Sequence, residues 1–246
     1  MLKDSSAFME RSVEREWLDE LPAGDPGALG SRRDLRRLNW WMGHARIMEQ
    51  ALSSFPNKGP VRLAELGAGD GDFLLRVARR LGGAWRGTQA TLVDLQNVVT
   101  ADTTRAFSVL GWIIQVDHGN VFEWCKRPFP EGTDLVLTNL FLHHFCSEEL
   151  QLLLAAIQAR SIFFVAIEPR RSLLSLLFSK LVGFIGCNAV TRHDAPASVR
   201  AGFLGREVSS LWPENGDWLT REQRAGLFSH LFVARKRTPM ESNKAA

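Results

Sequence analysis

The stretch that decides the fold is residues 61–72, V-R-L-A-E-L-G-A-G-D-G-D. A short apolar run opens it, and glycines then occupy every second position at Gly67, Gly69 and Gly71. An apolar run that stops at closely spaced glycines is typical of a buried strand that turns tightly into a helix. Glycine also permits positive φ and lets a ligand approach the backbone. The stretch therefore predicts a ligand-binding turn, with a tight turn that holds no ligand as the alternative.

Short apolar runs and amphipathic stretches alternate on the C-terminal side of this turn. Strands are predicted at 61–66, 89–93, 112–116, 135–138 and 162–167, and helices at 73–81, 97–110 and 147–159. This alternation is typical of βαβ units, so we predict an α/β fold with a mostly parallel sheet and helices on both faces. Two further strand-like runs, 218–222 and 227–235, are joined through a short Arg-Ala-Gly turn and predict a C-terminal antiparallel hairpin at the sheet edge.

The segment before the first strand is polar and helical. Turn residues gather at 21–30, and Ser31 with Asp34 resembles a capping box at the start of a helix. With 246 residues the chain suffices for one domain and an accessory segment. We predict an N-terminal helical extension or lid over 1–58, a ligand-binding domain over 59–238 with a helical, substrate-side insert at 170–215, and a disordered tail over 239–246.

The composition excludes several classes of protein. Hydrophobic residues make up 45% of the chain and charged residues 23%, which excludes disordered and fibrous classes. The net charge of +3 is scattered along the chain, so we expect no nucleic-acid partner. Cys125, Cys146 and Cys187 form no C-x-x-C pair, which argues against a disulfide framework and a zinc knuckle. No long apolar run indicates a signal peptide or membrane span, and we expect a cytoplasmic protein.

Acidic side chains surround the glycine turn. Glu65 precedes it, and Asp70 and Asp72 lie within or just after it. A dinucleotide-binding turn prefers G-x-G-x-x-G and holds a pyrophosphate, whereas this G-x-G-x-G turn with its carboxylates favours a cation. A ligand with an adenosine end, no phosphate, and positive sulfonium and ammonium groups fits this environment. We therefore predict S-adenosylmethionine as the cofactor.

Polar residues also follow the other predicted parallel strands. Asp94 ends the second strand, where a carboxylate can hold both ribose hydroxyls, although a surface aspartate that caps the next helix is the alternative. The Asn120 amide can meet an adenine amino group, while the Val121 backbone N–H can reach a ring nitrogen. Asn139 completes the rim after the fourth strand. The predicted cofactor site comprises Glu65, Gly67, Ala68, Gly69, Gly71, Asp94, Leu95, Asn120, Val121 and Asn139.

On four motifs, E-L-G-A-G-D-G-D, L-V-D-L, G-N-V-F-E-W and L-T-N-L-F-L-H-H-F, the chain resembles the class I S-adenosylmethionine-dependent methyltransferase family over roughly residues 61–236. The resemblance implies a Rossmann-like sheet in which the glycine turn cradles the methionine part of the cofactor and Asp94 holds the ribose. The family often has an acidic residue at the position of Asn120, for which Asp117 is a nearby substitute. Within the family, the chain is most similar to bacterial small-molecule enzymes that tailor quinones and polyketides. It lacks the Asn-Pro-Pro-aromatic motif of nucleobase methyltransferases at Asn139, which disfavours that target.

His193 is the leading candidate for a general base. It lies in a predicted polar loop, N-A-V-T-R-H-D-A-P, beside Asp194, which can orient an imidazole. Arg192 and Arg200 on either side can bind an acceptor's oxyanion or carboxylate. The alternative is a solvated histidine, or one that caps a helix.

His143 and His144 follow the fourth strand and form a second group of candidates. We expect one of them to line the pocket, with His143 as a second catalytic candidate and His144 as a substrate-binding residue. Adjacent histidines point in different directions, and no further ligand is spaced to join them, so we predict no metal site.

Apolar residues favour a lipophilic acceptor. The run at 172–185 predicts either a core helix or a lid that contacts a membrane surface transiently, and Trp41 can close the pocket from the other side or simply pack. We predict an enzyme that transfers a methyl group from S-adenosylmethionine to a small aromatic or lipophilic acceptor, with oxygen the favoured nucleophile, and that is a monomer or homodimer. The alternatives are C-methylation of a quinone-like ring, a protein or RNA acceptor, and a non-catalytic cofactor-binding module.

Overall fold

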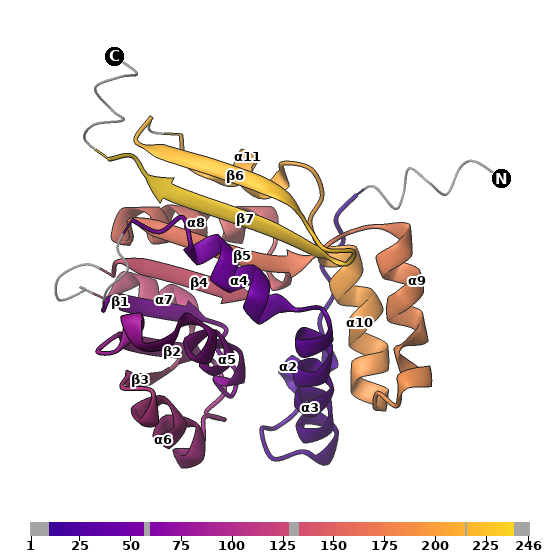
Figure 1. Cartoon of the computed structure of the whole chain (residues 1–246). Coiled ribbons are helices and arrows are strands. Elements are labelled where there is room, and N and C mark those ends of the chain that lie inside the picture. Colours follow the sequence, from indigo (N-terminus) through magenta and orange to yellow (C-terminus); the bar gives the residue numbers. More distant parts are fainter. Residues whose placement is uncertain (1–9, 57–59, 128–132, 215, 239–246) are drawn as a thin grey trace.

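A computed structural model describes residues 10–56, 60–127, 133–214 and 216–238. A single twisted sheet runs through the molecule, and helices cover it on both faces (Figure 1). The predicted tail at 239–246 lies outside the described residues.

The sheet has seven strands in the order β3-β2-β1-β4-β5-β7-β6. The strands are β1 (Arg62–Leu66), β2 (Gln89–Asp94), β3 (Ile113–His118), β4 (Leu135–Asn139), β5 (Phe163–Pro169), β6 (Trp218–Ala225) and β7 (Ser229–Lys236). Strands β1 to β5 are parallel, while β7 runs antiparallel to β5 and pairs with β6 as a hairpin. The predicted α/β fold with a mostly parallel sheet and a C-terminal antiparallel hairpin is confirmed.

The helices that flank the sheet divide into two layers. The elements are α4 (His44–Leu52), α5 (Asp72–Leu81), α6 (Ala101–Val109), α7 (Val121–Lys126), α8 (Ser147–Arg160) and α11 (Glu207–Leu211). Because side chains alternate across a strand, Leu135 and Leu137 of β4 pack with α4, α5 and α6, while Val136 packs with α7, α8 and α11. Both faces of the central strands are buried, as in other doubly covered parallel sheets.

The N-terminal extension contains α2 (Trp17–Glu20), α3 (Pro26–Trp41) and α4. The predicted capping box was wrong, because α3 begins earlier: Asp25 accepts hydrogen bonds from the backbone of Gly27 at 2.7 Å and of Ala28 at 3.2 Å. Ser31 and Asp34 are instead buried within the helix, where Asp34 accepts a hydrogen bond from the Asn188 backbone at 2.7 Å. Tertiary packing against another helix therefore explains these two polar residues.

The insert after β5 contains α9 (Leu173–Leu181), the 3₁₀ turn η3 (Val182–Ile185), α10 (Ala189–Ala201) and α11. The predicted polar loop around His193 was wrong, because α10 occupies that segment. Asn188 caps α10 by accepting a hydrogen bond from Thr191 N at 2.9 Å, and Pro196 is accommodated inside the helix. Within the described residues no helix combines the length and apolarity needed to cross a bilayer.

The extension and the insert pack together beside the carboxyl ends of the parallel strands. α10 contacts both α2 and α3, and these helices gather at the same end of the sheet as α9 (Figure 1). Segments far apart in the sequence therefore lie together at this end of the sheet.

Candidate active site

A cavity of about 460 Å³ lies at the carboxyl ends of the parallel strands. Its volume falls in the range of small-molecule and cofactor sites. The sheet contributes the wall around Glu65 and Asp94, the extension contributes α3, and the insert contributes α9 and α10. The sequence-predicted residues that line this cavity are Glu65, Gly67, Ala68, Gly69, Asp94, Leu95, Asn120, Val121, Asn139, His143 and His144.

Each glycine of the turn is needed for a different reason, which depends on its φ angle and on the atoms that a Cβ would meet. Gly67 has φ of +70°, and a Cβ there would meet the Phe141 ring at 2.2 Å. Gly69 has φ of +55° with open space where a Cβ would point, so its backbone faces the cavity. Gly71 is not part of the cavity lining; it precedes α5, and a Cβ there would crowd Leu92 and Thr103. The first two glycines shape the wall, while Gly71 shapes the turn.

Glu65 is a buried acid at the floor of the cavity. It is 1% exposed, and its Oε2 finds no hydrogen-bond partner among the described residues. Burial, followed by the charges of Asp70, Asp94 and Asp72, raises the pKa of Glu65 well above its ordinary value. A carboxyl in this position is stabilised when a cation enters the cavity and pairs with it.

Asp94 is held in place by the glycine turn itself. Its Oδ2 accepts a hydrogen bond from Gly69 N at 2.7 Å, and its Oδ1 accepts one from Gln96 N at 2.8 Å. Burial raises the pKa of Asp94 despite these hydrogen bonds. Each carboxylate oxygen has a further lone pair, so Asp94 can still accept hydroxyl hydrogen bonds from a ligand.

The asparagines after β3 and at the end of β4 line the cavity and also make structural hydrogen bonds. Asn120 caps α7 by accepting a hydrogen bond from Phe122 N at 2.8 Å. Asn139 Oδ1 lies 2.7 Å from Nδ1 of the buried His44, whose Nε2 lies 2.8 Å from Ser229 Oγ. The acid that we considered as a substitute for Asn120, Asp117, is paired with Arg127 and does not line the cavity.

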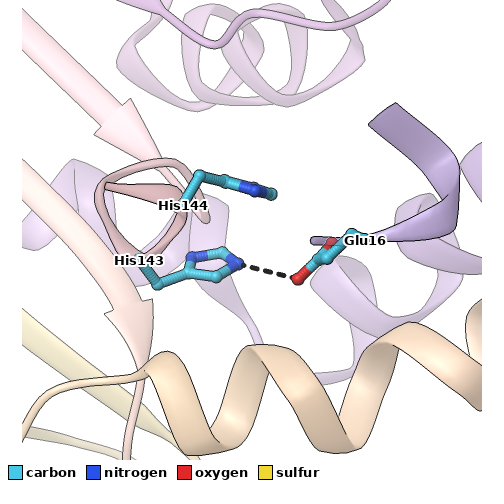
Figure 2. A group of neighbouring side chains, drawn as sticks. All are labelled: Glu16, His143 and His144. Carbon is cyan, nitrogen blue, oxygen red and sulfur yellow. Dashed lines mark ion pairs between the residues drawn. The ribbon is translucent and has the colours of Figure 1, made fainter. Parts of the chain in front are cut away.

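Histidines and carboxylates from the extension and from the loop after β4 also line the cavity, namely Glu16, Asp19, His143 and His144. His143 lies between two acids. Its Nδ1 lies 2.8 Å from Glu168 Oε2. Its Nε2 lies 3.4 Å from Glu16 Oε1 (Figure 2). The neighbouring His144 places Nδ1 3.1 Å from Asp19 Oδ2. The expectation that no further ligand accompanies the histidine pair was wrong, because ligand atoms of Glu16, His143 and His144 all lie within 4.8 Å of one another.

Burial and neighbouring charges shift the pKa values of His143 and Glu16 in opposite directions. Burial lowers the pKa of His143, but the contacts with Glu16 and Glu168 outweigh it and raise that pKa to about 9. Burial would raise the pKa of Glu16, yet its contacts with His143 lower it to about 2. His143 and Glu16 therefore form an ion pair at neutral pH.

Contacts of the N-terminal segment hold Glu16 at this wall. The Arg11 side chain donates hydrogen bonds to the carbonyls of Phe145 at 2.7 Å, His143 at 3.1 Å and Ala201 at 2.7 Å. Asp194 accepts the backbone N–H groups that open α2, at 2.9 and 3.0 Å. The extension is thus fastened to both the β4 loop and α10.

The remaining predicted site residues lie outside the cavity lining. His193 pairs with Asp194 at 2.7 Å, and its ring stacks on Trp17 with centroids 3.8 Å apart, so it supports α2. Arg192 and Arg200, also on α10, are not in the lining either. Trp41 stacks on Phe178, with ring centroids 5.0 Å apart, at an exposed edge of α3. None of these four residues lines the cavity.

Several lining residues were missed by the sequence analysis. They include Glu16, Leu18, Asp19, Arg36 and His44 of the extension, and Ser198 of α10. A further residue that was missed, Glu168, lies behind His143 at the end of β5. The rule that polar residues collect at the carboxyl ends of parallel strands could have found Glu168. No local pattern points to Glu16, whose place depends on tertiary packing.

No protein-family model matches this sequence, and no curated protein matches it. Solved structures nevertheless share its fold. A magnesium protoporphyrin IX methyltransferase from Synechocystis PCC 6803 with bound SAH superposes with a TM-score of 0.50 at 13% identity over 80% of this chain and 83% of that one. A putative O-methyltransferase from Nostoc punctiforme PCC 73102 gives 0.56 at 13% identity over 96% and 68%.

Human N-acetylserotonin methyltransferase in complex with SAM gives a TM-score of 0.54 at 19% identity, over 91% of this chain and 63% of that one. This chain therefore spans less than two thirds of the human enzyme's length. The likenesses show that the chain has the Rossmann-like fold of S-adenosylmethionine-dependent methyltransferases, as the sequence predicts.

Proposed function

We propose that this chain is an S-adenosylmethionine-dependent methyltransferase that acts on a small aromatic or lipophilic acceptor. The observation that carries the proposal is the buried Glu65, whose Oε2 has no partner among the described residues and which lines the same cavity as Asp94 and Gly69. This acidic wall suits a cationic ligand, and structural neighbours at low identity were solved with SAM or SAH. When bound, the cofactor supplies an electrophilic methyl group.

The residues that would hold the cofactor lie on three strand ends. Glu65 would pair with its positive charge, the backbone at Gly69 would lie against it, and Asp94 would accept its ribose hydroxyls. Asn120 and Val121 also line the cavity and would contact the base. This arrangement excludes a pyrophosphate, because the acids would repel it.

The rest of the cavity supports a lipophilic acceptor. Apolar side chains from the extension and the insert line it, namely Leu18, Leu35, Leu38, Met42, Phe178, Val182 and Val199. The polar side chains of His143 and His144 line the same cavity. An apolar pocket with a few convergent polar groups is the usual form of a small-molecule site. Such walls also exclude water, which favours displacement at a methyl carbon.

The acceptor's proton would pass to His144. Its ring lines the cavity, and Asp19 lies 3.1 Å from its Nδ1, so Asp19 would fix the tautomer and leave the other nitrogen as the base. The ion-paired His143 would remain a nearby cation that stabilises a developing oxyanion. This geometry favours methylation of oxygen over methylation of carbon.

A second property proposed for the same molecule is contact with an anionic membrane surface. Large apolar side chains of α3 and of the α9–η3 segment are exposed, including Trp40 at 71% and Phe184 at 88%. The two segments adjoin, since Arg37 Nη2 of α3 donates a hydrogen bond to Ile185 O at 3.0 Å. Arg33 and Arg37 supply positive charge beside the apolar surface, the pattern of interfacial helices. A lipophilic acceptor could then enter from the bilayer.

Isothermal titration calorimetry tests the proposed function directly. We expect the wild-type chain to bind both S-adenosylmethionine and S-adenosylhomocysteine. Glu65→Gln should lose more affinity for S-adenosylmethionine, which has a positive sulfonium, than for S-adenosylhomocysteine, whose sulfur is uncharged. Glu148→Gln, an exposed acid of α8, is the matched control. A labelled-methyl screen over phenols and hydroxyquinones then identifies the acceptor. Absence of any binding by the wild-type chain would overturn the proposal.

A further inference from the structure

Glu16, His143 and His144 come from two distant parts of the chain and meet at the wall of the cavity. We propose that these three side chains bind a divalent transition-metal ion of the zinc class. One carboxylate oxygen and one nitrogen from each imidazole all lie within 4.8 Å of one another (Figure 2). Two histidines and a carboxylate are a ligand set that zinc and neighbouring metals prefer.

The spacing within the cluster fits ligands of a common ion. His143 Nε2 and Glu16 Oε1 lie 3.4 Å apart, which is longer than an ordinary N–H···O hydrogen bond of about 2.7–3.2 Å. Two ligands that each lie about 2.0–2.2 Å from a tetrahedral zinc ion are separated by about 3.3–3.5 Å. The observed separation therefore suits two neighbouring ligands of one ion as well as the ion pair that these groups form in the metal-free chain.

A second layer of contacts orients the ligand atoms. Glu168 Oε2 lies 2.8 Å from His143 Nδ1, which directs Nε2 toward Glu16. Glu168 is itself fixed by hydrogen bonds from the backbone of Leu142 at 2.8 Å and Phe141 at 3.1 Å. Metal-binding histidines usually donate their other ring N–H to a carboxylate in this way. The histidine is therefore pre-oriented for an ion.

His144 and Glu16 show the same kind of support. Asp19 Oδ2 lies 3.1 Å from His144 Nδ1, and Ser198 donates a hydrogen bond to Glu16 Oε1. The carboxylates of Glu16, Asp19 and Glu168 thus surround two imidazoles, and this excess of negative charge favours a dication. Arg11 approaches from behind and donates to backbone carbonyls, away from the ligand atoms.

The ion would have two consequences. It would join the N-terminal segment to the loop after β4, because Glu16 precedes α2 and the histidines lie in the 3₁₀ turn η2 (Leu142–His144). Its remaining position would face the cavity, the arrangement of zinc sites that keep one place for water or substrate. The ion would displace the proton of His143 to solvent, so His143 acts as a cation and His144 as a base only in the metal-free chain. A role in binding the acceptor's oxygen rests on the proposed function, whereas binding of the ion does not.

The test uses the full chain, freed of metal with a chelator and titrated with Co²⁺ as a spectroscopic probe and with Zn²⁺ in competition. We expect one equivalent of Co²⁺ to give the visible absorption of a tetrahedral site, and Zn²⁺ to displace it. Glu16→Gln and His144→Gln should each weaken binding by tenfold or more, because each removes one ligand. His118→Gln is the matched control, since this exposed histidine of β3 lies outside the cavity lining and its loss should leave binding unchanged.

Circular dichroism of each variant confirms that it folds, and the partly exposed His144 is the milder of the two ligand substitutions. The proposal is overturned if the wild-type chain binds no stoichiometric metal, or if Glu16→Gln and His144→Gln bind as the wild type does. Calorimetry with S-adenosylhomocysteine on the same samples separates the two proposals. Metal binding without cofactor binding would overturn only the proposed function, and the converse would overturn only the metal site.

Discussion

Gly69 N donates a hydrogen bond to Asp94 Oδ2 at 2.7 Å, which joins the glycine turn after β1 to the acid at the end of β2. The two features that the sequence shows separately are therefore one unit in the structure. A change in either residue is expected to disturb the same wall of the cavity.

The first prediction concerns Asp94. Asp94→Ala removes the acceptor of two backbone hydrogen bonds and the proposed ribose contact, so we expect cofactor binding to weaken by about 1.5–3 kcal/mol. Calorimetry measures the loss. Asp102→Ala, which removes an exposed carboxylate of α6 that pairs with Arg105, is the control. Unchanged affinity in Asp94→Ala would exclude this residue from the cofactor site.

The second prediction separates two glycines of the turn. Gly67→Ala places a methyl group 2.2 Å from the Phe141 ring at positive φ, so we expect the free energy of unfolding to fall by about 1–3 kcal/mol from overpacking and by about 1–2 kcal/mol from the backbone. Gly69→Ala meets open space and bears only the backbone cost, but its methyl group enters the cavity. We therefore expect Gly69→Ala to impair cofactor binding more than stability.

Urea denaturation and calorimetry on both variants measure the two effects. Equal stabilities for Gly67→Ala and Gly69→Ala would contradict the difference in packing, and normal cofactor affinity in Gly69→Ala would contradict the placement of the ligand.

The third prediction distinguishes the histidines. In the metal-free chain we expect His144→Ala to lower the rate of methyl transfer to a phenolic acceptor by about 10²–10⁴-fold, the usual contribution of a general base, with little change in cofactor affinity. His193→Ala should leave the rate within a few fold, because His193 stacks on Trp17 outside the cavity. A larger loss in His193→Ala than in His144→Ala would reverse the assignment.

The fourth prediction concerns pH. Burial lowers the pKa of His44 from about 6.5 to about 4, although the hydrogen bond with Asn139 and the charge of Glu168 oppose this shift. The unfolded chain therefore binds more protons between pH 6.5 and pH 4, and the stability that His44 contributes is present above pH 6.5 and lost as the pH falls to 4. The full effect is about 3 kcal/mol.

Urea titrations at several pH values compare the wild-type chain with His44→Asn. We expect the difference in unfolding free energy between the two proteins to shrink as the pH falls from 7 to 4. A difference that stays constant over this range would show that His44 titrates normally.

The fifth prediction concerns the membrane surface. Phe184→Ser should reduce co-flotation with vesicles that contain phosphatidylserine, because Phe184 is 88% exposed beside the α3 arginines. Leu152→Ser, which changes an exposed leucine of α8, is the control. Equal flotation of the two variants, or none by the wild-type chain, would argue against this contact.

The sheet and the cavity wall at its strand ends could be predicted because their signals are local. Glycine spacing, apolar runs and polar strand ends each occupy a few consecutive residues, so the sequence places Glu65, Gly69 and Asp94 together without knowledge of packing, and they do line one cavity. The observed boundaries of the elements differ from the predicted ones by a few residues. For example, α6 begins at Ala101 after the N-cap Thr100, whereas the sequence predicts a start at 97.

The other half of the cavity depends on contacts between segments far apart in the chain. Glu16 reaches His143 only because Arg11 and Asp194 fasten the N-terminal segment to the loop after β4 and to α10. The T-R-H-D segment is polar and precedes Pro196, which favours a loop, yet packing against α2 and α3 stabilises it as a helix. Sequence periodicity carries no information about either contact.

The division of the cavity between the sheet and the appended helices has an evolutionary consequence. Mutations in α3, α9 or α10 can remodel their side of the cavity while the residues at the strand ends stay unchanged. If the proposed function holds, new acceptors could therefore be acquired by drift in the outer helices, without rebuilding the sheet.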